Sequence, residues 1–154
     1  MWRRLRTLLA LVGLCAVATC PTAQRSCTAR TRAAEADGLL DYLADRVADR
    51  VASTGRVPPT AAELAPAVGC CEQGGQCQPD PAAWAAPGWR ELAFTIDDPH
   101  RFRYAYLPDP SGLGATVRAI GDLACDGAPL QIELKLTVVG GKLVRARTRG
   151  APPP

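Results

Sequence analysis

The chain has 154 residues, enough for one domain, and 47% of them are hydrophobic, which excludes a chain that is disordered by composition. The formal net charge is +3, but three of the 18 basic residues, Arg3, Arg4 and Arg6, precede the first apolar run. Without these three, 15 basic residues remain against 15 acidic ones. The rest of the chain is therefore near neutral, and its charge gives no support to nucleic-acid binding.

The first 18 residues have the pattern of an export signal. Residues 1–7 are basic, residues 8–18 form an apolar or small-residue run, and Ala16-Val17-Ala18 supplies the small side chains that signal peptidase recognises. An apolar stretch of roughly 12 residues is too short to cross a hydrocarbon core of ~30 Å. We therefore expect cleavage after residue 18 and a mature protein outside the cytoplasm.

A lipoprotein signal is the second interpretation of this region. Val17-Ala18-Thr19-Cys20 resembles a lipobox in which Cys20 would carry the lipid, although threonine is unusual before a lipidated cysteine. Cleavage after residue 18 leaves an even set of cysteines, namely Cys20, Cys27, Cys70, Cys71, Cys77 and Cys125. Lipidation at Cys20 would leave five for disulfide bonds, so parity favours simple cleavage. Membrane contact is expected only through the signal or through a lipid on Cys20.

Residues 29–53 have a helical pattern. Four apolar residues repeat at intervals of four: Leu39, Leu43, Val47 and Val51. Four aspartates repeat at the same interval: Asp37, Asp41, Asp45 and Asp49. The two rows are offset by two residues, about 200° around the helix, so they lie on opposite faces. We interpret the acidic row as a solvated face, rather than as a metal or partner site. Its charge repulsion is reduced by Arg46 and Arg50.

Residues 54–90 are predicted to be a loop rich in cysteine, proline and glycine, beginning after the helix at Gly55 and Pro58-Pro59. A loop this long requires cross-links. The vicinal Cys70 and Cys71 are not expected to bond to each other, because the ring would be strained. Cys77 and Cys125 are the candidate partners, with Cys20–Cys27 as the remaining pair. Six cysteines allow 15 connectivities, so the pairing stays open.

Residues 91–148 predict an antiparallel sheet. The strand candidates are Glu91–Ile96, Phe102–Leu107, Ala115–Ile120, Leu130–Thr137 and Lys142–Thr148. Gly140-Gly141 provides a two-residue hairpin turn between the last two. Residues 151–154 are expected to form an unstructured tail. A helix followed by a meander is an α+β fold, here a single disulfide-stabilised domain over residues 19–150.

Several short motifs occur in a recognisable order. They are Cys70-Cys71 with Cys77, Trp84, Pro87-Gly88-Trp89, Leu92-Ala93-Phe94, Pro99 with Phe102 and Tyr104, and Gly121-Asp122-Leu123 with Cys125-Asp126-Gly127. Over roughly residues 36–138, this order resembles the globular part of bacterial type IV pilin-like proteins. The prepilin-peptidase motif and long apolar helix with which pilins begin are not found. The resemblance implies a pilin-like head on an ordinary export signal, associated with a type IV pilus or a secretion pseudopilus.

This resemblance leads us to expect a non-enzymatic structural or interaction protein of the bacterial envelope. It would lie in the periplasm, at the outer membrane or outside the cell, with an envelope protein as its partner. The residues offer little for catalysis, since no Ser–His or Cys–His pairing can be nominated. The single histidine, His100, is expected at the surface beside Asp97 and Asp98.

The sequence contains two further candidate ligand sites. Asp122, Asp126, Gly127 and Glu133 match positions 1, 5, 6 and 12 of a calcium loop, but Ala124 occupies position 3, where the pattern has a carboxylate. We expect a structural turn held by Cys125, with calcium bound by Asp122, Asp126 and Glu133 as the alternative; no other cofactor is expected.

The second candidate is an aromatic platform for sugars. Trp84 and Trp89 would form it, but we expect both in the core, since the chain has few other aromatic residues. A secreted binding module for a carbohydrate or a small ligand is therefore the alternative function.

Overall fold

The computed structural model describes residues 20–151, with side chains from residue 31 onward. The elements are helix α2 (Cys20–Thr54), strand β1 (Ala62–Ala65), the 3-10 helices η1 (Cys70–Gln73) and η2 (Pro81–Trp84), helix α3 (Pro87–Leu92), and strands β2 (Arg103–Pro108), β3 (Gly114–Gly121), β4 (Leu130–Val139) and β5 (Lys142–Gly150). Residues from Ala34 onward form one compact unit. The predicted signal and residues 152–154 of the predicted tail lie outside the described residues.

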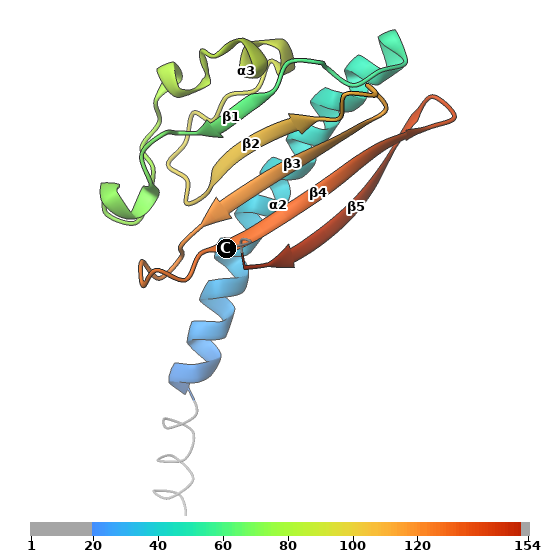
Figure 1. The fold of residues 1–154 in the computed structure, drawn as a ribbon. Helices are drawn as coiled ribbons and strands as arrows, with labels where there is room; N and C mark the ends of the chain where they lie inside the picture. Colours follow the sequence, from blue (N-terminus) through green and yellow to red (C-terminus); the bar gives the residue numbers. More distant parts are fainter. Residues whose placement is uncertain (1–19, 152–154) are drawn as a thin grey trace, which may run out of the picture. The chain divides into compact units, whose positions relative to one another are not determined.

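The strands form one antiparallel sheet in the order β1-β2-β3-β4-β5, with helix α2 against one of its faces (Figure 1). The predicted α+β class and the meander are therefore confirmed. Strands β4 and β5 are joined at Gly140 and Gly141, whose φ angles of 58° and 75° favour glycine. Among the described residues, no helix is long and apolar enough to span a membrane.

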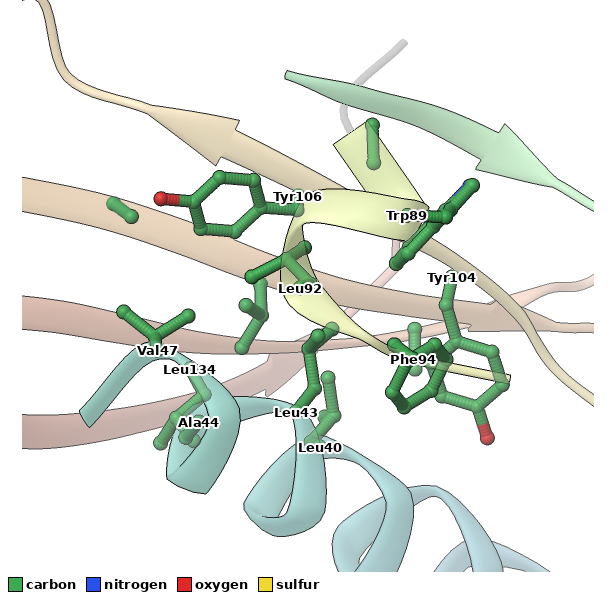
Figure 2. Packing of buried hydrophobic residues seen from close by; sticks show 14 of the residues in the cluster. Leu40, Leu43, Ala44, Val47, Trp89, Leu92, Phe94, Tyr104, Tyr106 and Leu134 are labelled. Atoms are coloured by element: carbon green, nitrogen blue, oxygen red, sulfur yellow. The ribbon is translucent and has the colours of Figure 1, made fainter. Parts of the chain in front are cut away.

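The core lies between α2 and the sheet (Figure 2). Leu40, Leu43 and Val47 of the helix are fully buried. Leu134 and its neighbours on β3 and β4 cover them from the sheet side (Figure 2). The predicted apolar row is confirmed, although Leu39, at its start, is only partly buried. Burial of each such side chain contributes about 1.5–3 kcal/mol, which makes this interface the main source of stability.

The prediction of a strand over Glu91–Ile96 is wrong, because these residues begin inside helix α3. Proline at position 87 fits the first turn of a helix, where its missing N–H costs nothing. Gly88 lets α3 approach β1, since a Cβ atom there would lie 2.2 Å from the carbonyl oxygen of Ala61. The helix ends at Leu92, and the φ angle of the next residue, Ala93, is 49°. The predicted loop over residues 54–90 likewise contains β1, η1, η2 and the start of α3.

An aromatic cluster surrounds Phe94. Its ring centroid lies 5.6 Å from that of Tyr42, 5.3 Å from Trp84 and 5.4 Å from Trp89. Trp84 is 4% exposed and Trp89 is 1% exposed, so their predicted place in the core is confirmed. The cluster joins α2, η2 and α3 through apolar area and ring contacts.

Two disulfides cross-link this region. Cys70 bonds to Cys77, and Cys71 bonds to Cys125. Each vicinal cysteine thus has its own partner, as the sequence predicts. The side chains of Cys20 and Cys27 lie outside the description. Disulfides persist in oxidising compartments, which indicates an exported protein.

Candidate functional site

The turn between β3 and β4 is organised by the carboxylate of Asp122. This group accepts hydrogen bonds from the backbone N–H of Gly127 at 2.7 Å, and from those of Ala124 and Asp126 at 3.3 Å each. The turn is tethered to η1 by the Cys71–Cys125 disulfide. Asp122 therefore caps the backbone of its own turn.

These backbone hydrogen bonds, with that of Gly127 the strongest, lower the pKa of the Asp122 carboxyl below its usual value. A lowered pKa in the folded state means that the carboxylate stabilises the turn above its unfolded pKa. That contribution is lost as the pH falls through the folded pKa. The charge of Asp122 is thus already engaged by the backbone of the turn.

The other predicted calcium ligands are placed unequally. Asp126 shares the turn, where its side chain accepts from the N–H of Ala128 at 3.0 Å. Glu133 lies on β4, where it accepts from Arg118 at 2.8 Å and from Gln131 at 3.0 Å. Among the residues with described side chains, no group of three or more histidine, cysteine, aspartate or glutamate residues could hold a metal ion. The structure brings Asp122 and Asp126 together, while Glu133 is paired on the sheet.

We expect millimolar calcium to leave the melting temperature of the wild type unchanged, and to raise that of Ala124→Asp. The substitution supplies the missing carboxylate, which favours binding of a hard cation. At a hundredfold excess over Kd, such binding stabilises the fold by about 2.7 kcal/mol. Ala52→Asp is the matched control, since it adds the same charge at an exposed position of α2, outside the turn. A large shift in the wild type would instead establish a native calcium site.

His100 is buried, so its expected place at the surface is wrong. The residue is 2% exposed, and its ring centroid lies 6.0 Å from that of Trp84 and 6.4 Å from that of Tyr104. The backbone of His100 pairs with that of Cys77 in an isolated bridge, which holds it against the domain. The alternation of buried residues at 100, 102, 104 and 106 is a signal that sequence reasoning missed.

The aspartate row of α2 faces charged side chains of β5. Three arginines at alternate positions of β5 share the face of the sheet that packs on the helix: Arg145, Arg147 and Arg149. Arg145 lies 2.5 Å from Asp45, Arg147 lies 2.5 Å from Asp41 and 2.9 Å from Asp37, and Arg149 also pairs with Asp37. We call these six residues the ion-pair ladder.

The ladder corrects the interpretation of the acidic row as a solvated face. Three of the four aspartates have partners on β5, and the fourth, Asp49, pairs with Arg46 of its own helix at 3.5 Å. The groups remain partly exposed, so each pair contributes between 0 and about 1 kcal/mol. Arginines alternate along β5, and aspartates repeat every four residues along α2. This complementary charge pattern is visible in the sequence.

Two surface depressions offer space for a small ligand. One, of about 510 Å³, lies between the end of α2 and the β2–β3 turn, and its lining includes Arg50, Arg56 and Asp109. The other, of about 490 Å³, lies beside Trp89 and is lined largely by alanine, with Glu63 among its polar residues. The burial of Trp84 and Trp89 means that neither ring offers an open face for stacking a sugar.

No family model matches this chain, and no curated protein or solved structure is similar to it at a significant level. The structure contains two features that the pilin-like resemblance implies. They are the N-terminal helix packed on an antiparallel sheet and the disulfides of the Cys-Cys cluster. Membership of the pilin-like family is therefore a proposal.

Proposed function

We propose that this protein is a non-enzymatic structural or interaction protein of the bacterial envelope, a pilin-like head associated with a type IV pilus or a secretion pseudopilus. The observation that supports this most is the docking of helix α2 on one face of the meander, with the Cys-Cys cluster fastened to the β3–β4 turn by Cys71–Cys125. Cross-links of this kind suit a domain that has to persist outside the cytoplasm.

The length of α2 is a second support. Its 35 residues correspond to about 52 Å at 1.5 Å per residue, whereas the ten residues of β4, the longest strand, span about 34 Å. The helix is thus longer than the sheet against which it packs. We infer that part of this length serves contacts with neighbouring chains, as a role in an assembly requires.

Affinity purification of the tagged full chain from cross-linked envelope fractions tests this function. We expect subunits of a filament or a secretion apparatus to be enriched, as measured by quantitative mass spectrometry. The matched control is the same tag on an unrelated exported protein with disulfides. Enrichment of no such component above that control would contradict the proposal.

A secreted carbohydrate-binding module is the second hypothesis, and a glycan array separates it from the first. The buried position of Trp84 and Trp89 leads us to expect no bound glycan. Specific binding that disappears in a folded Trp89→Phe variant would favour the module instead.

A further inference from the structure

The chain contains three Asp–Pro bonds, at Asp80–Pro81, Asp98–Pro99 and Asp109–Pro110, and all six residues are exposed. The amide to a proline nitrogen is tertiary, so no N–H stabilises it by hydrogen bonding. An aspartate carboxylate can reach its own backbone carbonyl carbon through a five-membered ring. Such an intramolecular attack has a high effective concentration, provided that other hydrogen bonds do not hold the carboxylate away from the carbonyl carbon.

Asp98 has both features that this attack requires. Its carbonyl oxygen lies 3.0 Å from Nδ1 of His100. A carbonyl only accepts, so Nδ1 carries the proton and donates it to this oxygen. Within the described part of the chain, the Asp98 carboxylate has no hydrogen-bond or ion-pair partner. The backbone carbonyl of Asp98 is thus polarised, and the side-chain carboxylate that would attack it has no other partner among the described residues.

The other two Asp–Pro bonds lack the free carboxylate. The side chain of Asp80 accepts from the backbone N–H of Ala82 at 2.9 Å and caps η2. That of Asp109 accepts from the N–H of Ser111 at 2.8 Å, and this bond lowers the pKa of its carboxyl. Each carboxylate is therefore held by its own turn, and their carbonyl oxygens accept only from backbone amides.

The burial of His100 is not explained by its hydrogen bonding alone. Its Nε2 atom is buried and has no partner among the described residues. An unpartnered polar atom in the core is costly, and a phenyl ring would fill the same space between Trp84 and Tyr104 without that cost. The one hydrogen bond of the ring is directed at the carbonyl of the Asp98–Pro99 bond.

We propose that the Asp98–Pro99 bond is an autoproteolytic site. A carboxylate oxygen of Asp98 forms a bond to its own carbonyl carbon, and His100 Nδ1–H stabilises the negative charge on the carbonyl oxygen. The C–N bond then breaks, and its electron pair goes to the nitrogen of Pro99, which takes a proton from the solvent. One water molecule opens the cyclic anhydride, so the first fragment ends at Asp98 with two carboxyl groups.

The disulfides determine whether the two fragments would separate after cleavage. Cys71 precedes the site and Cys125 follows it, so the Cys71–Cys125 bond joins the two fragments. Strand β1 of the first fragment also pairs with β2 of the second. The cleaved protein would therefore remain one molecule, and only reduction under denaturing conditions would separate it.

The experiment follows the oxidised full chain, incubated after purification, by mass spectrometry and by gels with and without reductant. We expect the unreduced mass to rise by one water, and reduction to release fragments that end at Asp98 and begin at Pro99. Cleavage there should be more than about tenfold faster than at either of the other two Asp–Pro bonds. Asp98→Ala should abolish it, and His100→Phe should slow it at least about tenfold. Asp97→Ala, an exposed neighbour, should leave it unchanged.

Equal rates at the three Asp–Pro bonds, or no gain of water at Asp98–Pro99, would overturn the proposal. So would a preference for this bond that persists in urea, because the unfolded chain has no buried His100. If circular dichroism shows that His100→Phe does not fold, Asp98→Glu provides the test instead. It keeps the charge but requires a larger ring, and cleavage as fast as in the wild type would exclude attack by the carboxylate.

Discussion

Val47→Asp is expected to destabilise the fold by about 3–5 kcal/mol. Val47 is fully buried in the interface between α2 and the sheet, where a new carboxylate would have no partner (Figure 2). Thermal and urea denaturation followed by circular dichroism measure the loss.

Asp45→Ala is the matched control on the same helix. The Asp45 side chain is 65% exposed, and its contact with Arg145 is a partly solvated ion pair. Its loss should cost under about 1 kcal/mol. Equal melting temperatures for the two variants would show that the helix does not present these faces as described.

Removal of the Cys71–Cys125 disulfide has the second largest expected effect. The bond closes a loop with a sequence separation of 54, which corresponds to about 4 kcal/mol of lost chain entropy in the unfolded state. The Cys70–Cys77 bond closes a separation of only 7, which corresponds to about 2 kcal/mol. We therefore expect Cys71→Ala with Cys125→Ala to lower the free energy of unfolding more than Cys70→Ala with Cys77→Ala.

Urea denaturation of the two double variants tests this order. Cys70 and Cys77 are buried, so their replacement also leaves a small cavity, which works against the expected ranking. A greater loss on removing Cys70–Cys77 would show that local packing, rather than the length of the closed loop, determines what each cross-link contributes.

Strand β5 has no buried residue, and its prediction rested on the two-residue turn at Gly140-Gly141. Periodicity was sufficient to predict α2, β3 and β4, because each buries one face over several residues. It was insufficient for α3, which is six residues long and too short to show a helical repeat. Its signals were local, with Pro87 at the first turn and Gly88 where the chain approaches Ala61. The close approach becomes apparent only once β1 is in place.

The contacts of the candidate sites were harder to predict than the elements. The turn at Asp122 could be expected from its sequence, since a carboxylate that caps its own backbone is a local interaction. The placement of Glu133 beside Arg118 depends on the pairing of β3 with β4. His100 is buried by contacts with Trp84, which is distant in sequence, so a turn-like local sequence gave the wrong expectation.

The ion-pair ladder also limits the register in which α2 docks. The four-residue repeat of the aspartates advances about 6 Å along the helix, close to the ~7 Å between alternate residues of β5. Charge pairing alone could therefore repeat after a shift of four helix residues. A shift that set Asp45 against Leu143, the next residue of β5 on that face, would leave Arg149 opposite Ala33. The opposite shift is opposed by the connection to β1, where Pro58 is buried and its carbonyl accepts from the Tyr106 hydroxyl at 2.7 Å. The loss of an ion pair opposes sliding in one direction, and a short tether opposes it in the other.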